Sequence, residues 1–259
     1  MIGLFDSGVG GLTVVRELLK KYPDVDFVYL GDTARYPYGN KSKETVERYA
    51  VEDAKFVIDR GADLVIVACN TASSLAMDKL RETYPGTLFL GVIEPAAELA
   101  AAKSKSSVGV IGTRATVGSG IYETVIRERN SKLKVLQKAC PLFVPLVEEG
   151  MLSDQVTKIM VRKYLTALRQ KNPESLILGC THYPFLQPLI ERFMGKKVEV
   201  INSAEAVVAK AFEMKPGLFA DSANPKQTIA FTDTSEHLDQ LASKWLKMTI
   251  KAEKVVLES

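Results

Sequence analysis

The sequence predicts an α/β fold of two similar domains, each with a mostly parallel sheet flanked by helices, and an active site in the cleft between them. Short apolar runs rich in Val, Ile and Leu recur, and each is followed by a stretch of helical period. Two of these runs, Leu64 to Cys69 and Leu176 to Cys180, end alike in a cysteine followed by a small polar pair. The chain of 259 residues, 46% of them hydrophobic, is long enough for a large core.

Each apolar run with strand-like composition predicts one strand. The expected strands are Ile2 to Asp6, Phe27 to Gly31, Leu64 to Cys69, Leu88 to Val92, Val108 to Gly112, Val135 to Ala139, Leu176 to Gly179, Val198 to Ile201 and Ile229 to Phe231. Amphipathic helices are expected after Thr45 and from Ser153 to Lys171, where Ser153 is a candidate cap.

A weak internal repeat predicts where the domains divide. The segment from Ile2 to Ser7 resembles that from Val108 to Thr113, at nearly the offset that separates the two cysteine runs. The Ala-rich stretch and the Lys/Ser-rich segment after it, residues 96–107, mark a boundary, and the chain is expected to cross back near residues 204–211. We therefore expect one domain from residues 1–95 plus 208–259 and a second from residues 96–207.

Composition narrows the class of protein. The net charge is +3 with scattered basic residues, so no nucleic-acid partner is expected. No apolar run approaches the roughly 20 residues of a membrane span, and the start lacks a signal-peptide pattern, so we expect a cytoplasmic protein without a membrane partner. Three cysteines with no C-x-x-C pair favour reduced thiols, and Cys180-Thr181-His182 alone is too small a set for structural zinc.

Cys69 and Cys180 are the strongest candidates for catalysis. Either cysteine alone is more often a buried core residue, but two with matching strands and matching polar flanks favour a paired role. A helix N-terminus after each strand is expected to favour the thiolate. Two such thiols can remove a proton from one face of a carbon and return one to the other.

The loop Asp6 to Gly11 lies between a predicted strand and an amphipathic helix. It resembles a dinucleotide fingerprint, but Thr13 stands where the third glycine belongs, so no nicotinamide or flavin cofactor is expected. The glycines are interpreted as letting backbone N–H groups approach a small anion such as a substrate carboxylate, with Asp6 as an acid/base or orienting group. A purely structural turn is the alternative.

Five other features bear on a site or on its surroundings. His182 lies two residues from Cys180 and is placed to hold a proton beside the thiol. His237 is expected in solvent and Cys140 in the core. The segment Tyr36 to Asn40 is read as a lid or pocket wall, with an ordinary turn equally open, and one carboxylate of Glu148-Glu149 could neutralise an ammonium group or simply be solvated.

Five segments together carry a resemblance that spans nearly the whole chain. They are Phe5 to Leu12, Tyr36 to Gly39, Ala68 to Ala72, Glu148 to Gly150 and Leu178 to Pro184. In this order they resemble the signature segments of the bacterial glutamate racemases, in the cofactor-independent aspartate/glutamate racemase family. Asn202 departs from that pattern, in which an aspartate is common.

The resemblance implies cofactor-independent interconversion of L-glutamate and D-glutamate, supplying the D-isomer for peptidoglycan, by a homodimer. It implies that Cys69 abstracts the proton from D-glutamate and Cys180 from L-glutamate. Asp6 would assist Cys69, and His182 with Glu148 would assist Cys180. The residues implied to bind substrate are Asp6, Ser7, Tyr38, Gly39, Asn70, Thr71, Thr113, Thr116, Thr181 and His182.

Other activities remain open at this point. A racemase of aspartate or another small acidic amino acid would share the pattern. A decarboxylase requires only one thiol, and both are present. A non-catalytic amino-acid-binding protein on the same fold would be expected to have lost a thiol, and neither Cys69 nor Cys180 is lost.

Overall fold

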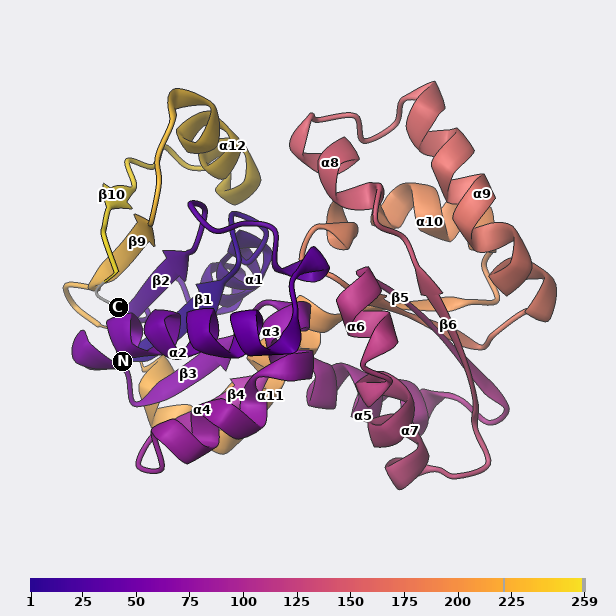
Figure 1. Cartoon of the computed structure of the whole chain (residues 1–259), viewed down its shortest axis with the longest axis horizontal. Coiled ribbons are helices and arrows are strands. Elements are labelled where there is room, and N and C mark those ends of the chain that lie inside the picture. The colour runs from indigo at the N-terminus through magenta and orange to yellow at the C-terminus, as the bar shows by residue number, and fades with distance from the viewer. Residues whose placement is uncertain (221, 258–259) are drawn as a thin grey trace.

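The computed structural model describes residues 1–220 and 222–257, and its framework is two separate parallel sheets. The sheets lie side by side, each with its own helices, and α3 (Asn70–Leu75) and α6 (Arg114–Gly118) face each other between them (Figure 1). We call each sheet with its helices a lobe, the first lobe carrying the N-terminus. The predicted fold class is confirmed.

The first sheet has the strand order β10-β9-β2-β1-β3-β4, with every neighbouring pair parallel. Its strands are β1 (Ile2–Asp6), β2 (Phe27–Gly31), β3 (Leu64–Val67), β4 (Leu88–Gly91), β9 (Gln227–Phe231) and β10 (Glu253–Lys254). Every residue of β1, β2 and β3 is buried, as expected for central parallel strands covered on both faces. Only the short β10 lies outside the predicted strands.

The second sheet has the order β6-β5-β7-β8 and is also parallel throughout. Its strands are β5 (Ser107–Gly112), β6 (Lys134–Ala139), β7 (Ser175–Gly179) and β8 (Glu199–Asn202). In both sheets a central strand ends beside a cysteine: β3 ends two residues before Cys69 and β7 one residue before Cys180. Open α/β sheets bind ligands at the carboxyl ends of their strands, so both cysteines lie where a ligand is expected.

Helices and helical turns fill the segments between the strands. Besides α3 and α6 they are α1 (Leu12–Lys21), α2 (Lys43–Asp59), α4 (Met77–Thr83), α5 (Ile93–Lys103), α7 (Ile121–Arg129), α8 (Phe143–Glu148), α9 (Gln155–Lys171), α10 (Gln187–Met194), α11 (Ser203–Met214) and α12 (Glu236–Leu246), with 3-10 turns at Tyr38–Asn40, Tyr183–Leu186 and Pro216–Phe219. Among the described residues, no helix is both long and apolar enough to cross a membrane.

Local capping explains where several helices begin. The Ser42 side chain accepts a hydrogen bond from the Thr45 backbone N–H and so caps α2. The predicted cap of α9 was wrong: Asp154 occupies the N-cap position, without a side-chain capping bond, and Ser153 lies one residue outside it. Asn202, the departure from the family pattern, caps α11 by accepting from Ala204 N–H at 3.0 Å. Its role is therefore structural.

The two lobes are joined where the chain passes between the sheets. Helix α5 follows β4 of the first sheet and leads to β5 of the second, while α11 follows β8 and leads back toward β9. These two helices pack against each other, and α11 also packs on α1 of the first lobe. The paired crossings leave the carboxyl ends of both sheets directed at the space between the lobes.

Candidate active site

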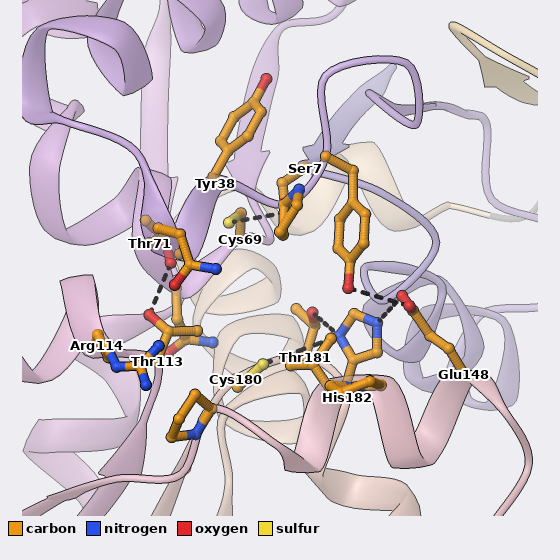
Figure 2. A pocket seen from close by; sticks show the side chains of 18 of the residues that line it. Ser7, Tyr38, Cys69, Thr71, Thr113, Arg114, Glu148, Cys180, Thr181 and His182 are labelled. Atoms are coloured by element: carbon orange, nitrogen blue, oxygen red, sulfur yellow. Dashed lines mark hydrogen bonds and ion pairs between the residues drawn. The ribbon is translucent and has the colours of Figure 1, made fainter.

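A pocket of about 410 Å³ receives both cysteines and takes residues from both lobes. Figure 2 shows Cys69, Ser7 and Tyr38 along one side of it and Cys180, Thr181 and His182 along the other. The lining residues are Ser7, Tyr36, Pro37, Tyr38, Gly39, Asn40, Cys69, Asn70, Thr71, Thr113, Arg114, Pro141, Leu142, Val144, Pro145, Glu148, Cys180, Thr181 and His182. Residues from far apart in the sequence therefore form one site.

Cys69 is the N-cap residue of α3 and lies almost entirely out of solvent, with 5% exposure. Its Sγ donates a hydrogen bond to Ser7 Oγ and accepts one from the Ala72 backbone N–H, both at 3.5 Å. Burial raises the pKa of the Cys69 thiol to about 12, and the nearby Asp6 carboxylate adds to the rise. The expectation that the helix N-terminus would favour the thiolate was wrong for the free protein, because burial outweighs the helix.

Cys180 follows β7 directly and is 6% exposed. Its Sγ lies 3.9 Å from Nδ1 of His182. Tyr183–Leu186 is a 3-10 turn whose N-cap is His182, so no α-helix begins at Cys180 and the expected helix N-terminus is absent from this second thiol. Instead of a helix N-terminus, the polar group beside the Cys180 sulfur is the ring of His182.

His182 is held between the thiol and a carboxylate. Its Nε2 lies 2.9 Å from Glu148 Oε1, and Nδ1 faces Cys180 and Thr181 Oγ1. Burial by itself lowers the pKa of His182, but the hydrogen bonds to Cys180 and Glu148 oppose it and raise the pKa to about 10. The ring is thus cationic at neutral pH and faces Cys180.

The loop after β1 is built around the Asp6 carboxylate. Asp6 is fully buried, and its Oδ2 accepts hydrogen bonds from the backbone N–H groups of Gly8 at 3.1 Å and Gly11 at 3.0 Å. Burial raises the pKa of Asp6, while His182 and these N–H groups lower it in part. The expectation that the glycine N–H groups approach a substrate anion was wrong for these two, because an internal carboxylate already occupies them.

Gly10 has a different reason to be glycine. A Cβ at this position would lie 2.5 Å from His182 Cε1 and 2.6 Å from His182 Nδ1, closer than real Cβ atoms approach. Nearby, Thr13 Oγ1 donates to the Thr181 carbonyl oxygen at 3.1 Å. The glycine loop therefore serves as a contact surface between the two lobes at the level of the site.

Polar side chains at the beginning of α3 and of α6 contact each other on the side of the pocket away from Glu148 (Figure 2). Thr113 Oγ1 lies 3.1 Å from Thr71 Oγ1 and donates to Thr116 Oγ1 at 3.0 Å. Asn70 Oδ1 accepts from Tyr122 Oη at 2.7 Å, and its buried Nδ2 has no partner among the described residues. Thr71, Thr113 and Asn70 line the pocket, whereas Thr116 is fully buried behind them. An unsatisfied buried amide is costly, so Asn70 presents a donor suited to a ligand.

Tyr38 and Gly39 form part of the pocket wall in different ways. The Tyr38 hydroxyl points away from the thiols in Figure 2 and hydrogen-bonds to Asp32 and to Asp53, the latter at 2.8 Å. Both acids also pair with Arg35. Gly39 approaches Thr113 so closely that a Cβ would lie 2.9 Å from Thr113 Cβ. Tyr38 and Gly39 thus contribute to the pocket wall mainly through their backbone atoms.

The structure also tests four predictions about residues in and around the site. Cys140 is fully buried and His237 is exposed, as predicted. Residues 36–40 line the pocket and so form a wall of it. Glu148 is not a simply solvated acid, because it pairs with His182.

Sequence reasoning missed Arg114 and an apolar wall of this pocket, and it did not predict the partner of Tyr36. Arg114 lines the pocket beside Thr113, and the apolar wall consists of Pro141, Leu142, Val144 and Pro145. Tyr36 donates from its hydroxyl to Glu148 Oε2 at 3.1 Å, a contact between the lobes. Arg114 begins α6 and Val144 lies in the first turn of α8, and neither short helix has a hydrophobic period long enough to indicate which residues reach the pocket.

The fold and the site together define a two-lobed α/β protein with a desolvated pair of thiols suited to proton transfer at a small polar molecule. Residues 12–211 match the model of the Asp/Glu/Hydantoin racemase family. The chain belongs to this family.

Known proteins match this chain over 85% to 99% of its length. The glutamate racemase of Persephonella marina is 45% identical over 257 residues, covering 99% of this chain and 97% of that protein. The glutamate racemase of Chlorobaculum parvum is 48% identical and covers 85% and 82%. The crystal structure of glutamate racemase isoform RacE1 from Bacillus anthracis matches with a TM-score of 0.94 at 35% identity, covering 98% and 97%. That of the Francisella tularensis enzyme with D-glutamate matches with a TM-score of 0.92 at 33% identity, covering 98% and 96%.

Proposed function

We propose that this protein is a glutamate racemase that interconverts L-glutamate and D-glutamate with Cys69 and Cys180 as the two acid/base groups. The single observation that carries the assignment of these residues is that equivalent strand ends of two lobes deliver both thiols into one pocket. The family relatives support the substrate, because this chain matches 82% and 97% of the length of two proteins named glutamate racemase. The product D-glutamate then supplies peptidoglycan synthesis.

Burial explains how thiols can act on so weak an acid. The α-proton of an amino acid is very weakly acidic, so a base must be strong, poorly solvated and correctly placed. Cys69 and Cys180 are 5% and 6% exposed, so a substrate in the pocket would meet sulfur atoms with little water around them. Inversion follows if one thiolate removes the proton from one face of Cα and the other thiol donates a proton to the opposite face.

The two thiols differ in their neighbours. The pKa of Cys69, raised to about 12 by burial, keeps that thiol protonated at neutral pH and ready to donate. The sulfur of Cys180 lies 3.9 Å from Nδ1 of His182, a group able to take up or release a proton beside it. We assign Cys180 as the base and Cys69 as the acid for L-glutamate, and the roles exchange for D-glutamate.

Polar groups around the pocket are suited to hold the substrate. We assign Ser7, Asn70, Thr71, Thr113 and Thr181 to its carboxylates and ammonium, with the backbone at Tyr38 and Gly39 completing the wall. Asn70 Nδ2 offers the clearest donor, because it lies buried without a partner among the described residues. Asp6 and Thr116 support the site from behind, as both are fully buried.

The proposal also includes the division into domains, the oligomeric state and the cellular location. We infer domains of residues 1–95 plus 208–259 and 96–207, supported by the division of the strands between two sheets. We also infer a homodimer, for which Val156 and Ile159 on α9, 49% and 50% exposed, offer apolar contact area. A cytoplasmic location completes the proposal.

A circular dichroism assay tests the activity. Purified protein is mixed with L-glutamate and no added cofactor, and the optical signal should decay to that of a racemic mixture. Glutamine should react far more slowly, because a site that binds a charged carboxylate leaves its donors unpaired with an amide, a penalty of up to about 10⁴-fold. Comparable rates on glutamate, aspartate and glutamine, or no reaction with glutamate, would contradict the proposal.

A further inference from the structure

Tyr36 connects the two lobes at the edge of the catalytic pocket. It belongs to the loop between β2 and α2 of the first lobe, whereas Glu148 ends α8 of the second. The Tyr36 hydroxyl donates to Glu148 Oε2 at 3.1 Å, and the other oxygen of the same carboxylate meets His182 Nε2 at 2.9 Å. The hydrogen-bonded series thus runs from Tyr36 through Glu148 and His182 to the sulfur of Cys180.

The tyrosine ring is held in place by its own lobe and by the histidine. The ring packs against Gly8, where a Cβ would lie 3.0 Å from Tyr36 Cδ2. Its centroid is 6.4 Å from that of His182, with the two planes inclined by 31°. A hydroxyl on a ring fixed in this way approaches Glu148 from one direction only, so the contact is set by the packing of the loop.

The hydrogen bond has a specific consequence for Glu148. This carboxylate is 24% exposed and stands on a short helix, so it needs a second partner to keep one orientation. A donor on Oε2 leaves Oε1 directed at His182, so the two hydrogen bonds together fix the carboxylate plane. The groups that face this pair are Cys180, Asp6 and Tyr36 itself.

We propose that Tyr36 is a positioning residue for the Cys180 side of the reaction: its hydroxyl orients Glu148 across the lobe boundary, and Glu148 orients His182 against the thiol. This inference rests on the proposed two-thiol racemisation of glutamate. It assigns Tyr36 no contact with the reacting carbon. Its effect falls on one of the two proton transfers and leaves the Cys69 side unchanged.

The Tyr36→Phe variant tests this assignment, because it removes the hydroxyl and keeps the ring. We expect kcat/KM to fall about tenfold, the size of one lost hydrogen bond to a charged group. The loss should be equal in both directions, since the two enantiomers have equal free energy. Primary isotope effects with α-deuterated substrates separate the two steps. The effect should rise for the enantiomer from which Cys180 takes the proton and fall for the other.

A matched control is the Tyr84→Phe variant. The Tyr84 hydroxyl donates to the Val51 carbonyl oxygen, also at 3.1 Å, and neither residue lines the pocket. Its activity and both isotope effects should match those of the unaltered protein. Thermal unfolding of both variants checks that the fold is kept.

A double-mutant cycle with Glu148→Gln tests whether Tyr36 acts through Glu148. If it does, the Tyr36→Phe change should cost little more once Glu148 is neutral. Independent support comes from NMR of the two histidines: the His182 ring signals should shift in Tyr36→Phe while those of His237 stay unchanged.

Other results would overturn the assignment. Unchanged kcat/KM, isotope effects that change equally for both enantiomers, or additive losses in the cycle would each show that Tyr36 does not position the Cys180 side. If instead the unaltered protein fails to racemise glutamate, the proposed function itself is contradicted, and the role of Tyr36 with it.

Discussion

Gly10 of the first lobe lies directly against His182 of the second, with room for a hydrogen atom but not for a methyl group. The glycine loop and the Cys180 segment are separated by most of the chain, yet they form one packed surface beside the site. The position of the catalytic histidine candidate therefore depends on how closely the lobes approach.

Replacing this glycine should separate the lobes. We expect Gly10→Ala to lower the free energy of unfolding by about 1–3 kcal/mol, as overpacking of a tight contact does, and to lower kcat/KM by at least tenfold as His182 is displaced. Urea unfolding and the racemisation assay measure the two effects. Gly86→Ala is the control, because a Cβ there meets no atom within 4 Å. Equal behaviour of the two variants would show that the close contact is unimportant.

The thiols should each be indispensable. Cys69→Ala and Cys180→Ala should each reduce racemisation by at least about 10³-fold while the circular dichroism spectrum of the fold is kept, since removing an acid/base group costs about 10²–10⁴-fold. Serine replacements should retain traces, because a hydroxyl can donate a proton but is a poor base. The buried Cys140 provides the matched control, and Cys140→Ala should remain active. Substantial turnover by either of the first two variants would refute the two-base scheme.

His182 should make stability depend on pH. Its pKa in the folded protein is about 10, above the usual value near 6.5, so the folded state binds the proton more tightly. The stabilisation is complete below about pH 6.5 and is lost as the pH rises through 10. His182→Asn should therefore be less stable by about 2 kcal/mol at pH 6, and this deficit should shrink toward pH 10 in urea unfolding. The exposed His237→Asn should show no such trend; a constant deficit for His182→Asn would contradict the account.

Tyr38 should affect stability through its hydroxyl. Burial raises the pKa of Asp53 well above its usual range, and the adjacent Asp32 raises it further. The Tyr38 hydroxyl hydrogen-bonds to both acids beside Arg35. Tyr38→Phe removes one hydrogen bond from each of these buried acids, leaves them paired with Arg35, and should cost about 1–3 kcal/mol in urea unfolding. KM for glutamate should change less than tenfold. A large rise in KM with unchanged stability would place the hydroxyl on the substrate instead.

The sequence alone predicted the features that follow from a local pattern of residues. Apolar runs predicted nearly every strand, because a parallel strand buried on both faces needs a continuous apolar run. The two cysteines were recognisable because each ends such a run. The role of Gly10 was not predictable, since it depends on His182, which is distant in sequence and adjacent only after folding. Tyr36 lies on a loop and Arg114 begins the short helix α6, so neither the contact of Tyr36 with Glu148 nor the place of Arg114 in the pocket follows from a local period; both come from the packing of the lobes.

The most direct test of the two-thiol account follows hydrogen at Cα in deuterium oxide. Two thiols on opposite faces require that the proton delivered to product come from a group that has exchanged with solvent. Starting from pure L-glutamate, the first D-glutamate formed should carry deuterium at Cα while the remaining L-glutamate stays mostly protiated, as measured by proton NMR at low conversion. Retention of substrate hydrogen in the product, or deuterium entering L-glutamate as fast as D-glutamate appears, would contradict the assignment of Cys69 and Cys180 as separate bases.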